Sequence, residues 1–269
     1  MDLLTIKDYV KLRKEELKIK IASLKRAPKL AIVQVNDDVA SNSYVKGKLK
    51  DASELGIEAI LIKLDEKTSQ DELLAKVKQL NEDISIDGII VQLPLPKHIS
   101  EQEVKKIIDP KKDVDGFHPL SSFEACTPKG IVSYLTYLGF EFNGKNAVII
   151  GRSNIVGRPL AKMLLDRSMN VTVLHSKTKL EDRDRFLRYA QLIVVATGQP
   201  YLLKKDVPLL KDAVLVDVGI SRVEGHLVGD IEPRDDVLLV TPVPGGVGLL
   251  TRLSLMENVM EAYENGISC

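Results

Sequence analysis

Residues 147–159 have the sequence AVIIGRSNIVGRP and constrain the fold of this chain more than any other stretch. Residues 147–150 form a short apolar run, long enough for one buried strand. Gly151 then allows the backbone to turn sharply, and Gly157 lets a helix begin close to a ligand or to the sheet. Pro159 suits the first turn of that helix, where its missing N–H would have no partner. The stretch therefore predicts a strand, a tight turn and a helix.

The residues that follow complete a βαβ unit. Leu160, Met163 and Leu164 recur at helical spacing, so one face of the helix packs on the sheet. Residues 171–174 then form a second strand. In such a unit the N-terminus of the helix faces the turn and can bind the pyrophosphate of a dinucleotide. The glycine spacing differs from the common G-x-G-x-x-G, so an ordinary βα turn remains the alternative.

The end of the second strand indicates which dinucleotide would bind. NAD-binding units usually place Asp or Glu there to accept the ribose 2′-OH. This chain has His175, Ser176 and Lys177 instead, without a carboxylate. Arg152 lies in the preceding turn, and a cation together with a hydroxyl suits a 2′-phosphate. The pattern therefore favours NADP over NAD.

Strands and helices alternate along the rest of the chain. Strands are expected at residues 30–35, 57–64, 87–96, 147–150, 171–174, 191–196, 214–218 and 238–241. Helices are expected at residues 6–24, 41–55, 70–80, 101–108, 128–138, 181–189 and 250–264, in addition to the helix that follows Gly157. This order predicts an α/β fold of two domains, each a mostly parallel sheet flanked by helices, with the C-terminal one Rossmann-like. Ligands in such folds lie at the carboxyl ends of the strands, so a cleft between the domains is expected.

Capping residues mark where several of these helices begin. Ser41 or Ser43 is expected to cap the second helix, and the third helix is expected to start near Ser69. Thr127 is expected to cap the helix at 128–138. Cys126, beside it, is predicted to be a small packing residue.

Composition excludes several classes of function. Lys and Arg number 38, as do Asp and Glu, so the net charge of zero gives no electrostatic reason to bind nucleic acid or an anionic membrane. No apolar run approaches the roughly 20 residues that span a bilayer, and residues 1–20 lack the apolar core of a signal peptide. Cys126 and Cys269 form no disulfide framework, which favours the cytoplasm. Neither the cysteines nor the four histidines have metal-ligand spacing, so no metal is expected.

Polar residues at four further places are candidates for chemistry. Tyr44 and Lys48 share a helix face, where tyrosine can stack on an aromatic ligand and a partly desolvated lysine can act as a base. A solvated lysine face is the alternative. Gln92 follows a buried apolar run and can face a site, or be satisfied by nearby backbone. Asp115, in a loop, can accept paired N–H donors from a heterocycle, or bond its own backbone as turn aspartates do. The loop at 242–248 is rich in Gly and Pro and can bring backbone close to a ligand, or be a rigid turn.

Together, these stretches resemble the bifunctional methylenetetrahydrofolate dehydrogenase/methenyltetrahydrofolate cyclohydrolase family. The matching segments, in the family's order, are residues 44–48, 87–96, 112–119, 126–130, 151–159, 175–178, 217–220, 228–230 and 241–248. Segments 87–96 and 241–248 are the most specific. Two alternatives are another two-domain NADP dehydrogenase, of the shikimate or amino-acid type, and a non-catalytic NADP-binding protein.

The resemblance implies that NADP oxidises 5,10-methylenetetrahydrofolate to the methenyl cation, which water then converts to 10-formyltetrahydrofolate. It places catalysis at Lys48, Gln92 and Asp115. Substrate binding would use these three residues with Tyr44, Pro244, Gly245 and Gly246. Cofactor binding would use Gly151, Arg152, Ser153, Ile155, Val156, Gly157, Ser176, Thr197, Gly198 and Ile220.

The resemblance also implies how the chain is organised and where it works. A folate-binding catalytic domain would comprise residues 1–120 and the C-terminal helix 250–269, and an NADP-binding domain residues 121–249. The family forms homodimers through its cofactor domains, works in one-carbon metabolism and purine biosynthesis, and uses no metal in most bacterial members.

Three positions depart from the family pattern. The segment at residues 120–125 is shorter than usual. Leu249 replaces a proline in the last loop, and Asn36 replaces a common glycine after the first strand.

Overall fold

The computed structural model describes residues 5–267, and these divide into two compact units. The first unit comprises residues 11–126 and 252–267, and the second comprises residues 5–10 and 127–251. Helices α1 (Ile6–Ala22) and α8 (Val247–Ile267) contribute residues to both units. Cys269, used above to argue for the cytoplasm, lies outside the described residues. Within residues 5–267, no helix is long and apolar enough to cross a membrane.

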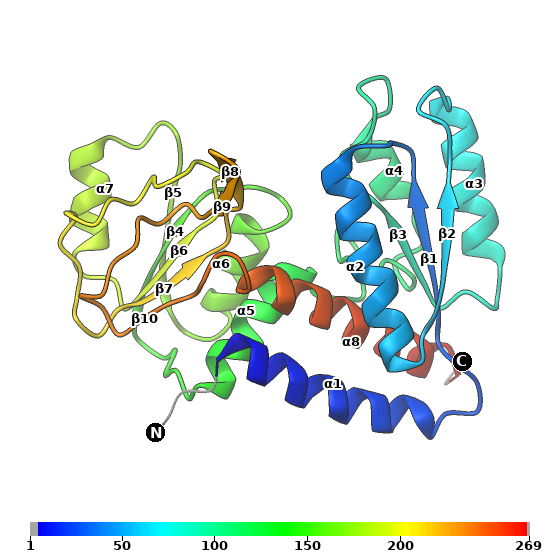
Figure 1. The fold of residues 1–269 in the computed structure, drawn as a ribbon, viewed down its shortest axis with the longest axis horizontal. Coiled ribbons are helices and arrows are strands. Elements are labelled where there is room, and N and C mark those ends of the chain that lie inside the picture. The colour runs from blue at the N-terminus through cyan, green and yellow to red at the C-terminus, as the bar shows by residue number, and fades with distance from the viewer. Residues whose placement is uncertain (1–4, 268–269) are drawn as a thin grey trace. The chain divides into compact units, whose positions relative to one another are not determined.

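The first unit is built on a parallel sheet with strand order β2-β1-β3. Its strands are β1 (Lys29–Gln34), β2 (Glu58–Lys63) and β3 (Gly88–Val91), and its further helices are α2 (Val39–Leu55), α3 (Gln70–Glu82) and α4 (Glu101–Ile107). Successive side chains of a strand point to opposite faces, so Leu30 and Ile32 pack with residues of α1, α2 and α8. Ala31 and Val33 pack on the other face, with residues of α3 and α4 (Figure 1).

The second unit contains a parallel sheet of five strands in the order β10-β7-β6-β4-β5. Its strands are β4 (Asn146–Ile150), β5 (Asn170–Leu174), β6 (Leu192–Val195), β7 (Val214–Asp217) and β10 (Leu239–Val240), and its helices are α5 (Cys126–Tyr137), α6 (Gly157–Leu165) and α7 (Leu180–Leu187). Ala147 and Ile149 pack with α5 and α6, and Val148 and Ile150 pack with α7 on the other face. The predicted fold of two domains with parallel, helix-flanked sheets is confirmed.

Two of the predicted helix caps are wrong. Helix α2 begins at Val39, and its cap is Asp38, whose carboxylate accepts a hydrogen bond from Ser41 N at 2.8 Å. Asp38 takes this place because a carboxylate accepts from the first free N–H groups of a helix as well as a serine does. Thr127 lies within α5, and its Oγ1 is 2.9 Å from Thr251 Oγ1. Ser69 does cap α3, in a reciprocal pair with Glu72.

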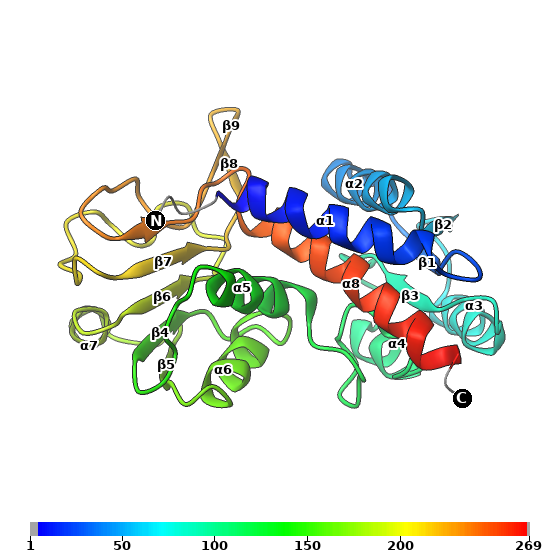
Figure 2. The ribbon, with the colours of Figure 1, turned by 90° about the horizontal axis from the view of Figure 1, so that it is seen from below.

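The hairpin formed by β8 (Ser221–Val223) and β9 (His226–Val228) was not predicted. Each strand has only three residues, which is too short for a hydrophobic period to show. The turn between them holds Glu224 at φ 48° and Gly225 at φ 84°, and glutamate is not a usual residue for a left-handed position. The hairpin projects from the sheet of its unit (Figure 2).

Candidate functional site

Lys48 and Gln92 meet in the first unit, although they come from different elements. Lys48 lies on α2, and Gln92 directly follows β3 at the carboxyl end of the sheet. Lys48 Nζ donates to Gln92 Oε1 at 3.1 Å, while Gln92 Nε2 donates to the Leu93 carbonyl at 2.7 Å. The second bond fixes the amide, so its oxygen faces the lysine and its nitrogen does not.

Tyr44 lies one turn before Lys48 on α2 and keeps 48% of its surface exposed. Its ring is therefore free to contact a ligand. Between the two, Gly47 leaves room for the Arg252 guanidinium, which a Cβ at this position would strike. Arg252 Nε and Lys14 Nζ both contact the buried Asp51 carboxylate, at 3.1 and 2.6 Å. This charge cluster, which the sequence did not reveal, fixes the helix that carries Tyr44 and Lys48.

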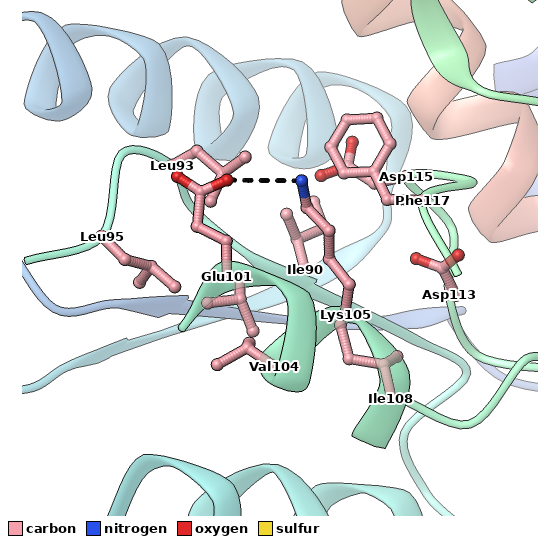
Figure 3. Close-up of a pocket in the computed structure, with 11 residues that line it drawn as sticks. Ile90, Leu93, Leu95, Glu101, Val104, Lys105, Ile108, Asp113, Asp115 and Phe117 are labelled. Carbon is pink, nitrogen blue, oxygen red and sulfur yellow. Dashed lines mark hydrogen bonds and ion pairs between the residues drawn. The ribbon is translucent and has the colours of Figure 1, made fainter. Parts of the chain in front are cut away.

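Asp115 is half-buried in the loop after α4, where it lines a small cavity with Asp113, Phe117 and Lys105 (Figure 3). The cavity volume is about 10 Å³, room for about one water molecule. Lys105 Nζ lies 3.4 Å from Glu101 Oε2 and 5.3 Å from the centre of the Phe117 ring. None of residues 5–267 donates a hydrogen bond to the Asp115 carboxylate, so its oxygens are available to a ligand.

Asp113 has the backbone-bonding role that Asp115 lacks. Its Oδ2 accepts from His118 N at 2.7 Å, and the residue is only 1% exposed. Burial raises the pKa of the Asp113 carboxyl, and the nearby charge of Asp115 adds to the shift. The two carboxylates of this loop therefore differ: Asp113 holds the loop, whereas Asp115 accepts no hydrogen bond from residues 5–267.

Two departures from the family pattern lie beside these residues. Asn36 donates to the Pro94 carbonyl at 2.5 Å, and so ties the end of β1 to the segment that follows Gln92. A Cβ on Gly116 would lie 2.6 Å from Ala125 N, so the shortened segment at 120–125 returns directly against the loop that carries Asp115.

The predicted cofactor turn of the second unit is tightly packed. Gly151 has φ +127°, and a Cβ there would strike the Ala196 carbonyl. A Cβ on Gly157 would strike the Gly151 carbonyl. Ser153 Oγ accepts from Val156 N at 3.1 Å and from Gly157 N at 3.4 Å, two backbone N–H groups at the start of α6. Only glycine fits at both positions, because the backbone of the turn packs closely against itself and against Ala196.

The remaining predicted cofactor residues lie around this turn. Arg152 and Ser176 are exposed, and Arg152 forms no ion pair with any of residues 5–267. Ile155 is half-buried, and Ile220 is 40% exposed. Thr197 and Gly198 form the turn after β6, and Asp230 holds their N–H groups.

Pro244, Gly245 and Gly246 form the loop before α8, where Gly245 has φ +93°. A Cβ on Gly246 would strike the Pro242 carbonyl, so this loop is also tightly folded. Helix α8 begins at Val247, earlier than the predicted residue 250, and Leu249 lies in its first turn.

Asp217 and Asp230 are two buried acids that the sequence analysis did not single out, although both lie in segments that match the family. Burial raises the pKa of the Asp217 carboxyl to about 6, and the charge of Asp230 adds to the shift. The Asp230 carboxylate packs against Gly219, and the Asp217 carboxylate packs against Gly229. An aspartate and a glycine close together in both segments was the sequence signal that could have identified these acids.

The raised pKa makes stability depend on pH. Unfolded Asp217 would lose its proton near its ordinary value of 3.8, whereas folded Asp217 keeps it to about pH 6. Its contribution to the free energy of unfolding is therefore present below pH 3.8 and lost as the pH rises through 6, by about 3 kcal/mol. In urea unfolding, we expect the free energy of unfolding of wild type to fall by this amount between pH 4 and 7, relative to that of Asp217→Asn. The exposed control Asp212→Asn should keep the wild-type pH profile, and a pH-independent difference for Asp217→Asn would contradict this account.

Among residues 5–267, no group of three or more His, Cys, Asp or Glu side chains is arranged to hold a metal ion.

Comparison with known proteins gives two family models that match the chain. The model for the tetrahydrofolate dehydrogenase/cyclohydrolase catalytic domain matches residues 4–115. The model for the tetrahydrofolate dehydrogenase/cyclohydrolase NAD(P)-binding domain matches residues 125–267. Together they cover both units.

Individual relatives match along almost the full length. The bifunctional protein FolD of Halothermothrix orenii is 48% identical over 263 residues, which is 93% of this chain and 92% of the relative. The structure of the bifunctional FolD methylenetetrahydrofolate dehydrogenase/cyclohydrolase from Campylobacter jejuni has a TM-score of 0.92 and 43% identity, covering 96% of both chains. The structure of the Trypanosoma brucei N5,N10-methylenetetrahydrofolate dehydrogenase-cyclohydrolase, complexed with NADP and an inhibitor, has a TM-score of 0.93 and 31% identity, covering 99% of this chain and 98% of the other.

Proposed function

This chain belongs to the tetrahydrofolate dehydrogenase/cyclohydrolase family, and from that membership we propose which of its residues carry the family's two reactions. The enzyme oxidises 5,10-methylenetetrahydrofolate to 5,10-methenyltetrahydrofolate with NADP, and then hydrolyses the product to 10-formyltetrahydrofolate. The alternatives that the sequence left open, a shikimate- or amino-acid-type dehydrogenase and a non-catalytic binding protein, are set aside by this assignment.

The assignment of residues rests on the contact between Lys48 and Gln92. The same unit carries Asp115, whose carboxylate accepts no hydrogen bond from residues 5–267. Asp115 would accept the paired N–H donors of the pterin, and exposed Tyr44 would stack on the aminobenzoyl ring. Lys48 would take a proton from the attacking water, with Gln92 holding the amine in place. Pro244, Gly245 and Gly246 would contact the substrate through their backbone.

The second unit fits a dinucleotide. The close packing at Gly151 and Gly157 leaves no room for side chains, so backbone can approach a pyrophosphate at the start of α6. Gly151, Ser153, Ile155, Val156 and Gly157 would hold the pyrophosphate and adjoining ribose. Arg152 and Ser176 would hold the 2′-phosphate, and Thr197, Gly198 and Ile220 the nicotinamide half. When bound, NADP supplies the acceptor for the hydride.

Removing the Arg152 charge tests the 2′-phosphate contact. A charge-assisted hydrogen bond contributes about 1.5–3 kcal/mol, so Arg152→Ala should raise the Michaelis constant for NADP by about tenfold or more. Use of NAD, which lacks the phosphate, should change little. Arg188→Ala, at another exposed arginine, is the matched control and should behave as wild type. Equal losses with NADP and NAD would refute the role of Arg152.

The function is tested by mixing the protein with NADP and 5,10-methylenetetrahydrofolate. Absorbance should rise at the band of the reduced cofactor, and 10-formyltetrahydrofolate should accumulate. Methenyltetrahydrofolate added by itself should lose its own absorbance band as it is hydrolysed. Protein that binds NADP yet turns over neither folate would contradict the proposed residue roles.

We also propose that the first predicted domain (residues 1–120 and 250–269) binds folate and the second (residues 121–249) binds NADP. The same proposal places the protein in the cytoplasm, where its product would supply one-carbon units for purine biosynthesis. The charge balance gives no support for nucleic acid or membrane partners.

A homodimer through the cofactor domain completes the proposal. The β8–β9 hairpin exposes Val223 and Leu227, at 36% and 40%, and such apolar side chains favour contact with another chain. Light scattering on the purified protein should give twice the chain mass. Val223→Asp with Leu227→Asp should shift it toward the monomer, whereas Leu165→Asp, at an exposed leucine on α6, should not. A monomeric wild type would refute the dimer.

A further inference from the structure

Asp230 is the most fully buried acid near the proposed cofactor site, at 0% exposure. Its Oδ2 accepts three hydrogen bonds, from Thr197 N at 2.6 Å, Thr197 Oγ1 at 2.8 Å and Gly198 N at 2.9 Å. Its Oδ1 is buried and receives no hydrogen bond from any of residues 5–267. All three of these hydrogen-bond donors therefore belong to the turn that follows β6.

A second acid fixes the backbone that carries Asp230. Asp217 Oδ1 accepts from Asp230 N, and Asp217 Oδ2 from Ile231 N, both at 2.9 Å. Asp217 is itself tied to the residue after β10, because its own N–H donates to Thr241 Oγ1 at 2.8 Å. The chain of contacts runs from the end of β7 to Asp230 and then to the turn after β6.

Both carboxylates press against glycine backbone. A Cβ on Gly219 would overlap the Asp230 carboxylate, and a Cβ on Gly229 would overlap that of Asp217. Gly219 directly precedes Ile220, a proposed cofactor contact. The packing of Asp230 against Gly219 therefore also restricts the position of the backbone before Ile220. Burying two acids costs free energy of desolvation. A neutral polar side chain could hold the backbone of a turn that only connects strands. The arrangement therefore suggests a role beyond connecting strands.

The direction of the hydrogen bonds decides what the turn presents to a ligand. A trans peptide places C=O and N–H on opposite sides, and the N–H groups of Thr197 and Gly198 face Asp230. The carbonyls of Ala196 and Thr197 therefore point away from it. The Ala196 carbonyl lies against Gly151, at the start of the proposed cofactor turn.

We propose that Asp230 is a positioning residue for the cofactor, which orients the Thr197–Gly198 turn so that the carbonyl oxygens of Ala196 and Thr197 accept hydrogen bonds from the carboxamide or ribose hydroxyls of bound NADP. Asp230 acts through the turn and touches no cofactor atom. The inference rests on the proposed function, which assigns Thr197 and Gly198 to the NADP site.

Calorimetric titration with NADP tests the inference on four variants of the whole protein. Asp230→Ala removes the acceptor of three bonds and should weaken NADP binding by about tenfold or more, the change expected for one lost bond to a charged group. Asp230→Asn should stay within about threefold of wild type, because an amide oxygen can take the place of Oδ2 and Oδ1 has no bond to lose. Thr197→Val should weaken binding by less than Asp230→Ala, and Thr197→Ser should bind as wild type.

Hydrolysis of added methenyltetrahydrofolate without NADP separates positioning from a general loss of structure. This reaction should keep its rate in Asp230→Ala and Asp230→Asn. If Asp230→Ala does not fold, the inference is tested by comparing the NADP affinity of Thr197→Val with that of Thr197→Ser. Wild-type NADP affinity in both Asp230→Ala and Thr197→Val overturns the inference. The inference is also overturned if the hydrolysis rate and the thermal stability of Asp230→Ala fall in the same proportion as its NADP binding. A wild type that hydrolyses the folate but binds no NADP would overturn the cofactor assignment and this inference together.

Discussion

Lys48→Met should lower cyclohydrolase activity by about 10²- to 10⁴-fold, the usual contribution of a general base. Hydrolysis requires the attacking water to lose a proton, and Lys48 Nζ, held 3.1 Å from Gln92 Oε1, is the proposed acceptor. A side-chain amine can accept that proton, and the Gln92 amide oxygen holds it in place. Methionine keeps the length of the side chain and removes the amine.

Dehydrogenase activity should fall less in the same variant. Hydride transfer needs the methylene carbon held near the nicotinamide, and no water loses a proton in that step. The variant should therefore accumulate methenyltetrahydrofolate during turnover, measured by its absorbance beside the rate of NADP reduction. Lys46→Met, at an exposed lysine on the same helix, is the matched control and should keep both activities. An equal fall in both activities, or unaffected hydrolysis of added methenyl substrate, would remove Lys48 from the proton transfer.

Asp115→Ala should weaken folate binding by about 10²-fold or more. Two pterin N–H donors would lose a charged acceptor, and each such bond contributes about 1.5–3 kcal/mol. Titration with NADP should be unchanged, because Asp115 belongs to the first unit and the proposed cofactor residues belong to the second. The measurement is calorimetry with each ligand.

Two further variants make this test specific. Asp115→Asn keeps the size of the side chain but replaces one acceptor oxygen with a donor, so it should bind folate almost as poorly as Asp115→Ala. Asp71→Asn, at an exposed aspartate on α3, should bind folate as wild type. Unchanged folate affinity in Asp115→Ala would exclude this residue as the pterin contact.

The sequence alone determined the fold class and most elements. Apolar runs such as residues 147–150 and 214–216 are buried between helices, and such runs are visible without a structure. Helix α3 was expected to start near Ser69, and Ser69 is its cap, because a helix start depends only on neighbouring residues. Local signals were weaker for α2, where Asp38 and Ser41 are both good caps and only the backbone path selected Asp38.

The strand order was decided by the tertiary structure. In the second sheet, β4 lies between β5 and β6, and β10 lies at the edge beside β7. Apolar composition is nearly the same in all these strands, so it does not specify which pairs form. The β8–β9 hairpin also escaped prediction, since three-residue strands carry no measurable period.

For the site, helical spacing placed Tyr44 and Lys48 on one face, and the resemblance assigned their roles. The sequence could not show that Gln92, 44 residues from Lys48, turns its amide oxygen toward the amine. Nor could it show that Asp230 accepts the N–H of Thr197, 33 residues away, while Asp115 receives no bond from residues 5–267. Backbone preferences and side-chain periodicity act over a few residues, and they determine elements. The partner of a buried polar group depends on which distant segments pack against it, and only the folded chain determines that.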